Sequence, residues 1–169
     1  MTILEAFHTL LLNGTIASDQ ADQSMEFHGY ADEEAGLLGS AAVWRSYAEQ
    51  GRNIAVMLNQ DMTEYTAGYT SRQMKPKVGI IIEYVDVPLT SLMRRIIAVY
   101  TDAEKGDLVC GYACSDHAAA FVLESEISKD YLNPKHHATR DTADIIEFAY
   151  MLELARMAVG LAVEPTFAA

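Results

Sequence analysis

Short runs of β-branched residues alternate along this chain with segments of helical periodicity, and this alternation restricts its fold more than any other feature. The runs NIAVMLNQDM at 53–62 and KVGIIIEYV at 77–85 are typical of buried strands. Helical segments stand before the first run and after the second, so the strands are expected to lie mostly parallel. We predict an α/β fold of three layers, α/β/α, in which helices flank a mostly parallel mixed sheet.

The remaining elements are predicted from periodicity and from the positions of glycine and proline. Glycine or proline stands at or next to one end of each predicted helix, and these helices cover 3–14, 36–51, 88–100 and 141–164. Further strands are predicted over 24–31, 107–113 and 118–126. The stretch 64–76 is predicted to be a long exposed loop.

The length and hydropathy of the chain are those of one domain. A chain of 169 residues buries roughly 70% of the surface that its unfolded form exposes, and no low-complexity linker divides it. No apolar run approaches the roughly 18 residues that a membrane span needs, and no secretory signal opens the sequence. We therefore predict a single domain over 1–169, with no membrane partner and with a cytoplasmic or undetermined location for the chain as written.

The charge of the chain argues against one class of partner. Twelve lysines and arginines stand against 24 aspartates and glutamates, for a formal net charge of -12. Such a surface repels phosphate backbones and anionic lipids. Nucleic acid is therefore not expected as a partner.

Candidate zinc ligands follow three of the predicted strands. In open α/β sheets, ligands bind at the carboxyl ends of the strands, where Glu33, Glu34, Asp61 and His137 are expected. Carboxylate oxygens and imidazole nitrogens bind zinc at about 2.0–2.2 Å, and two-zinc sites hold their metals roughly 3.5–4 Å apart. The alternative for any one acidic residue is a solvated position at a loop, which is the common case for Asp and Glu.

The two cysteines, Cys110 and Cys114, lie in CGYAC. Two cysteines are too few for a disulfide-stabilised small protein, and their spacing does not fit a zinc ribbon. They either form one local disulfide across a tight turn or remain two thiols.

Several segments resemble one enzyme family. They are TILEAF, EFHGYADEEAGLLGS, NIAVMLNQDMTEYT, GIIIEYVD, CGYACSDHAAA, AFVLESE, NPKHHATRDT and MLELA. In this order they resemble the zinc-dependent leucine aminopeptidases of bacteria and fungi, a family of secreted dizinc exopeptidases. The resemblance runs from residue 2 to about 165 and implies the C-terminal part of the family's catalytic domain.

The resemblance assigns roles to the candidate ligands. It implies that Glu33 is the general base for the attacking water, that Glu34 and His137 bind one zinc, and that Asp61 binds the other. Adjacent glutamates suit this division, because one carboxylate can face the metal and the other the water.

The resemblance also implies which of the two alternatives for the cysteines in CGYAC applies. In the family this loop is closed by a disulfide, which implies a bond between Cys110 and Cys114. The tyrosine between them, Tyr112, is implied to line the substrate site near the scissile bond.

The function implied by the resemblance is that of a zinc metallo-aminopeptidase, which removes an apolar N-terminal residue from peptides. The family's site has two further ligands, a histidine and a bridging aspartate, upstream of the segment that TILEAF resembles, where this sequence begins. We therefore expect a catalytic domain truncated at its N-terminal side, with activity impaired by the missing ligands. The alternative is a non-catalytic remnant or interaction module of the same fold, with self-association or a partner at an uncovered sheet edge.

Overall fold

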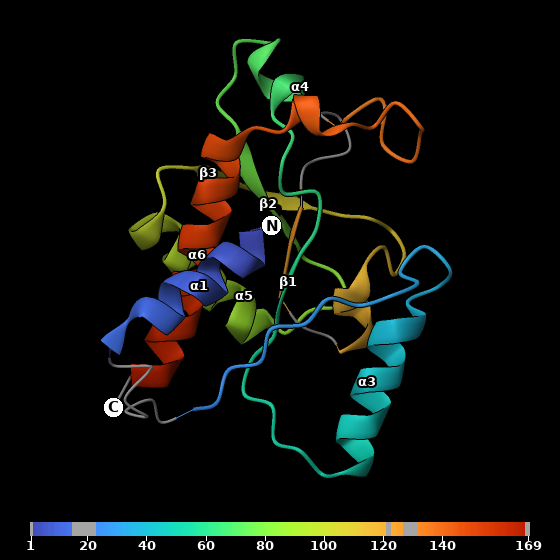
Figure 1. The fold of residues 1–169 in the computed structure, drawn as a ribbon, viewed down its shortest axis with the longest axis vertical. Helices are drawn as coiled ribbons and strands as arrows, with labels where there is room; N and C mark the ends of the chain where they lie inside the picture. Colours follow the sequence, from blue (N-terminus) through green and yellow to red (C-terminus); the bar gives the residue numbers. More distant parts are fainter. Residues whose placement is uncertain (1, 15–22, 121–122, 127–131, 168–169) are drawn as a thin grey trace.

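The computed structural model of the protein describes residues 2–14, 23–120, 123–126 and 132–167 (Figure 1). Its longer helices are α1 (Thr2–Leu12), α3 (Leu38–Glu49), α5 (Val87–Tyr100) and α6 (Phe148–Phe167). Its strands are β1 (Leu58–Gln60), β2 (Lys77–Ile81), β3 (Glu104–Leu108) and β4 (Leu123–Glu126). Its short helical turns are α4 (Ala67–Thr70), η1 (Asp116–Ala119) and η3 (Ala143–Ile145).

The four strands form one mixed sheet in the order β1-β4-β2-β3. Strand β1 runs parallel to β4, and β2 runs parallel to β3, whereas β2 and β4 are antiparallel. Two of the three pairings are thus parallel, and the predicted mixed α/β sheet is confirmed.

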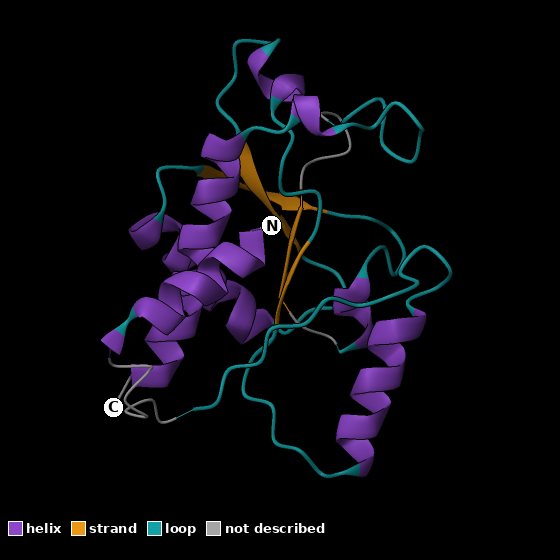
Figure 2. Ribbon diagram, viewed as in Figure 1, coloured by secondary structure: helices purple, strands orange, loops and turns teal. Residues whose placement is uncertain are grey.

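Helices cover both sides of this sheet (Figures 1 and 2). Helices α1 and α5 both contact α6, and together these three helices lie on one side. Helix α3 lies on the other side, where it contacts η1. No helix in the described part of the chain is long and apolar enough to cross a membrane.

The main core lies between β2 and the helices α5 and α6. Val78 and Ile80 are two residues apart on one face of β2, and both are fully buried. The helices contribute residues spaced three, four or seven apart, as expected for apolar helix faces. The core consists of Val78, Ile80, Met93, Ile96, Ile97, Tyr150, Leu154, Met157 and Leu161. The Tyr150 hydroxyl donates to the carbonyl of Lys77 at 2.9 Å, which ties α6 to β2.

The prediction of a strand over 24–31 is wrong. Residues 24–30 have neither helical nor strand structure and join no ladder of the sheet. Instead, the carbonyl of Ala31 accepts a hydrogen bond from the amide of Gly39 in the first turn of α3. The segment therefore packs along a helix. The alternation of its side chains does not predict this packing, because it depends on contacts with residues later in the chain.

The predicted loop over 64–76 is also only partly correct. It contains the short helix α4, in which Tyr69 is 2% exposed. Its aromatic residue packs inside the fold, whereas the composition of the segment suggested a polar surface loop.

Other predicted elements are shifted or shortened. The strand expected at 53–62 is reduced to β1, and the one expected at 107–113 is β3, which ends before the cysteine loop. Within the described part of the stretch expected as a strand at 118–126, η1 occupies the start and β4 the end, and residues 121–122 lie outside the described residues. Strand β3 ends there because Leu108 is the last residue that pairs with β2.

The last helix begins later and ends later than predicted. The turn η3 and an extended Ile146 precede α6, and the amide of Glu147 donates to the carbonyl of Glu64 at 2.8 Å. This tertiary bond ends the expected continuous helix. At the other end α6 continues past Pro165 to Phe167, because a proline close to a helix end disturbs few intrahelical hydrogen bonds.

Candidate functional site

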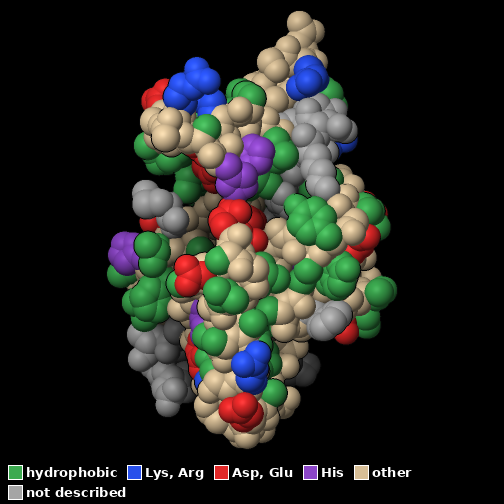
Figure 3. All heavy atoms as spheres, turned by 90° about the vertical axis from the view of Figure 1, so that its right-hand side faces the viewer, with side chains coloured by type: hydrophobic (Ala, Val, Ile, Leu, Met, Phe, Trp, Pro, Cys, Tyr) green, Lys and Arg blue, Asp and Glu red, His purple; other side chains and the backbone are tan. Residues whose placement is uncertain are grey.

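The residues that the sequence singles out line one cavity of about 610 Å³. Figure 3 shows histidine and acidic side chains next to each other on the corresponding face of the molecule. The predicted site residues at this cavity are Glu33, Glu34, Asp61, Cys110, Tyr112, Cys114 and His137. They come from four separate parts of the sequence, so the fold has brought them together.

A tight turn before α3 carries the two glutamates. The carbonyl of Glu33 accepts hydrogen bonds from the amides of Gly36 and Leu37, at 3.0 and 2.9 Å. Asp32 and Leu37 have left-handed backbone angles, with φ values of 57° and 59°. A left-handed conformation is unfavourable for a residue with a side chain, so contacts on both sides of the turn must maintain it.

Glu34 lies beside the predicted zinc histidine. Its Oε1 is 3.2 Å from the Nδ1 of His137, although the two residues are 103 positions apart in sequence. Both side chains are largely exposed at the cavity. A carboxylate and an imidazole that converge in this way are a donor pair suited to zinc.

The loop that carries His137 is held by Asn133. The side chain of Asn133, which is buried, donates to Asp141 at 2.8 Å and accepts from the amide of Lys135 at 2.9 Å. The carbonyl of Asn133 lies 2.9 Å from the Nδ1 of His136, whose ring packs against that of His137. These bonds close the loop and keep both histidines at the cavity.

Asp61 is oriented by two hydrogen bonds. Its Oδ1 accepts from the amide of Met62 at 2.8 Å, and its Oδ2 accepts from the hydroxyl of Ser115 at 2.9 Å. Ser115 is buried and also accepts from the side chain of Asn59 at 2.9 Å. The sequence reasoning missed Ser115, and the only available signal was its position directly after the cysteine loop.

The cavity is strongly acidic. Of the described residues that line it, none is lysine or arginine, whereas five are carboxylic acids: Glu33, Glu34, Asp61, Glu64 and Asp141. Burial raises the pKa of Glu33, and the charges of Glu34 and Asp61 raise it further. Burial likewise raises the pKa of Glu64, with further contributions from Asp141 and Asp61. Such a cluster of like charges favours the binding of a cation.

The donor chemistry fits zinc, although the full ligand set is not preassembled. Among the residues that the structure describes, no group of three or more His, Cys, Asp and Glu side chains is close enough to hold a metal ion. At the cavity, Glu34 and His137 lie next to each other, and Asp61 lines the same cavity.

The cysteine loop forms one wall of the cavity. Cys110 and Cys114 are joined by a disulfide, with their Cα atoms 6.2 Å apart. Gly111 turns the chain with a φ of 81°, and its amide donates to Glu83 at 2.7 Å. The ring of Tyr112 is largely exposed at the cavity rim, where a ligand can reach it.

Comparison with known proteins gives consistent matches over nearly the whole chain. The sequence model of peptidase family M28 matches residues 2–162. Leucine aminopeptidase 1 of Penicillium rubens is 43% identical and covers 99% of this chain, and the same holds for leucine aminopeptidase 1 of Coccidioides posadasii. The crystal structure of Legionella LapA has a TM-score of 0.83 at 26% identity, covering 98% of this chain and 45% of LapA.

The match extends over only part of each relative. The chain spans 45% of the length of both curated leucine aminopeptidases. The described fold thus corresponds to about half of those proteins, and this half carries the cavity described above.

Proposed function

The chain belongs to peptidase family M28, and from this we propose that it forms part of a zinc-dependent aminopeptidase that removes an apolar residue from the N-terminus of peptides. The single observation that supports this best is the convergence of Glu34 and His137, 3.2 Å apart, on a cavity also lined by Glu33 and Asp61. An acidic cavity also suits the positively charged N-terminus of a peptide.

Each site residue has a distinct proposed role. Glu34 and His137 would hold one zinc ion and Asp61 a second, and bound zinc would polarise the scissile carbonyl. Glu33 would take a proton from the attacking water and pass it to the leaving amine. Its half-buried position and raised pKa support this role, because a general base is most effective when its pKa lies near the pH at which the enzyme works.

Tyr112 and the disulfide would shape the binding site for the substrate. The exposed ring of Tyr112 can contact a peptide at the cavity rim, and the disulfide keeps the loop in place. The disulfide also supports secretion, because such bonds persist in oxidising compartments outside the cytosol.

A non-catalytic interaction module of the same fold is the alternative. It is favoured by the absence, within the described residues, of any group of three metal-binding side chains, since a catalytic zinc normally has three protein ligands. The edge strands of the described sheet, β1 and β3, would then be the places where a partner or a second copy pairs.

A zinc titration of the full chain, together with hydrolysis of a leucyl chromogenic amide, tests this proposal. We expect that Glu33→Gln retains zinc binding but lowers kcat by about 100-fold or more, the usual contribution of a general base. His137→Ala should weaken zinc binding instead, because it removes a ligand. Replacement of the exposed His8 of α1 by alanine is the matched control and should change neither quantity.

Two outcomes would reject parts of the proposal. If the wild-type chain binds no zinc at micromolar concentrations, the metal site is wrong and the interaction module is favoured. If it binds zinc but hydrolyses no leucyl amide in the presence of excess metal, the catalytic assignment fails for this chain.

A further inference from the structure

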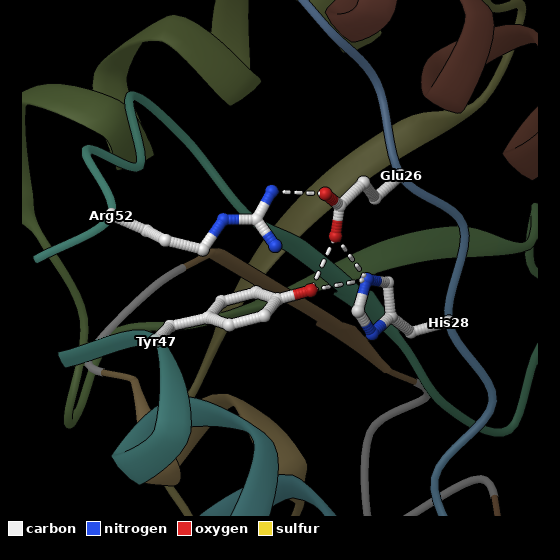
Figure 4. Close-up of polar contacts among 4 residues, drawn as sticks. All are labelled: Glu26, His28, Tyr47 and Arg52. Atoms are coloured by element: carbon white, nitrogen blue, oxygen red, sulfur yellow. Dashed lines mark hydrogen bonds and ion pairs between the residues drawn. The ribbon is translucent and has the colours of Figure 1, made fainter. Parts of the chain in front are cut away.

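A second polar cluster lies outside the cavity, at the C-terminal end of α3 (Figure 4). The carboxylate of Glu26 accepts hydrogen bonds from the hydroxyl of Tyr47 and from the guanidinium of Arg52, and it lies 3.1 Å from the Nε2 of His28. The guanidinium of Arg52 stacks over the ring of Tyr47, 4.1 Å from its centroid. These bonds, that of Tyr47 foremost, lower the pKa of Glu26 to about 2.

This cluster joins two segments on either side of the glutamate turn. Glu26 precedes the turn, whereas Tyr47 and Arg52 lie at the far end of α3 and just beyond it. At the near end of the helix, the amide of Gly39 donates to the carbonyl of Ala31 at 3.0 Å. The segment and the helix therefore run side by side in opposite directions, and the turn at 32–37 connects them.

At the start of α3, the helix and the segment are packed so closely that neither can shift freely. A Cβ atom on Gly39 would lie 2.5 Å from the carbonyl oxygen of Ala31, so only glycine fits there. The segment leads directly from this contact into the turn at 32–37. Residues 24–30 form no strand, so no hydrogen-bonded ladder of the sheet holds them, and side-chain bonds to Tyr47 and Arg52 hold the segment instead.

We propose that Glu26 is a positioning residue for the adjacent glutamates: through Tyr47 and Arg52 it fastens the extended segment to α3 and so maintains the strained turn that presents Glu33 and Glu34. The left-handed Asp32 and Leu37 make this turn dependent on its flanks. The expected effect of Glu26 on zinc binding rests on the proposed function. Its effect on the stability of the turn can be tested without metal.

The alternative is that Glu26 forms only a surface ion pair. Pairs of this exposure contribute little to global stability, so a melting temperature does not distinguish the two roles. Local opening of the turn distinguishes the two roles, because hydrogen exchange reports the free energy of opening residue by residue.

The test uses the full chain with Glu26→Gln, which removes the charge and keeps the size. We expect the amides of Gly36 and Leu37, which bond to the carbonyl of Glu33, to exchange about fivefold faster, since local opening sets their protection. Zinc binding should weaken by about threefold or more, because the cost of ordering Glu34 is then subtracted from the binding free energy. Glu49→Gln, at an exposed glutamate of the same helix, is the matched control and should change neither quantity.

A second variant checks the route through α3. Tyr47→Phe removes the hydroxyl donor and keeps the ring, so it should reproduce part of the effect. The effects of the two substitutions should be less than additive in the double variant, because both weaken the same contact between Tyr47 and residue 26. If Glu26→Gln does not fold, as judged by circular dichroism, Tyr47→Phe carries the test with the same criteria.

Unchanged exchange at Gly36 and Leu37 in the folded variant would overturn the inference, as would full additivity of the two substitutions. Failure of the wild-type chain to bind zinc would reject the proposed function instead, and the exchange measurement would still decide whether Glu26 holds the turn.

Discussion

Single side chains at the cavity differ in environment although many are of the same type. Glu34 is exposed and paired with His137, whereas Glu33 is partly buried among other carboxylates. Their neighbouring positions predicted a shared site, but the sequence did not predict which carboxyl has a raised pKa. That difference depends on burial and on the approach of Asp61 and Asp116, which lie in other parts of the chain.

The half-buried Glu64 provides a pH-dependent test of this electrostatic description. Burial first, and then Asp141 and Asp61, raise its pKa, so its ionised form destabilises the metal-free fold at neutral pH. We expect Glu64→Gln to raise Tm at pH 7 by about 2 °C, and this gain should disappear as the pH falls through the raised pKa to the ordinary carboxyl range. Thermal melts of metal-free protein at pH 7 and pH 4 measure the effect.

The sign follows from the protonation states. An acid whose pKa is raised by folding binds more protons in the folded state, so low pH removes the penalty and substitution then gains nothing. Glu5→Gln, at an exposed position of α1, is the control and should leave Tm unchanged at both pH values. A gain for Glu64→Gln that is equal at both pH values would contradict the electrostatic explanation.

Among the elements, the helices were predicted better than the strands. The signals of α5 lie in the sequence: Asp86 caps it by accepting from the amide of Leu89 at 2.8 Å, and proline follows at its first turn. The start of α6 instead depends on a bond between Glu147 and the carbonyl of Glu64, far away in the sequence. Local sequence signals therefore predict the end of a helix correctly only where local contacts hold that end.

The contact between α5 and α6 is tight enough to require a glycine. A Cβ atom on Gly160 would lie 2.7 Å from the ring of Tyr100. We expect Gly160→Ala to destabilise the fold by about 1–3 kcal/mol despite the better helix propensity of alanine, because the ring base has to move. Urea denaturation measures this loss.

Gly14→Ala is the matched control for that substitution. Its added Cβ would meet no atom within 4 Å, so little change in the free energy of unfolding is expected. A Gly160→Ala variant as stable as the wild type would show that α5 and α6 are farther apart than in the structure.

The molecule as a whole presents apolar residues on the outside of its helical layer. Leu4 and Leu11 are 64% and 51% exposed, and their spacing of seven places them on one face of α1. Leu152 of α6, the helix against which α1 packs, is 48% exposed. Exposed apolar surface of this kind favours association.

We therefore expect the isolated chain to self-associate in sedimentation velocity experiments at tens of micromolar, despite its net charge of -12. Leu11→Lys should shift the distribution towards the monomer, because it places a charge in the apolar face. Val99→Lys, at an apolar position of α5 that is 73% exposed, serves as the control. Association that persists unchanged in Leu11→Lys would direct attention to the edge strands β1 and β3 instead.

The sequence was sufficient for the α/β class, for the main helices and for some of the residues that line the cavity, among them Glu33, Glu34 and His137. It carried this information because helix caps, apolar periodicity and short motifs are local properties of the chain. The packing of 24–31 along α3, the burial of Tyr69, the support of Asp61 by Ser115 and the contact of Glu34 with His137 were decided by the tertiary structure. These features join residues that are distant in sequence, and the energies that select them arise only when the folded chain brings those residues into contact and excludes water from between them.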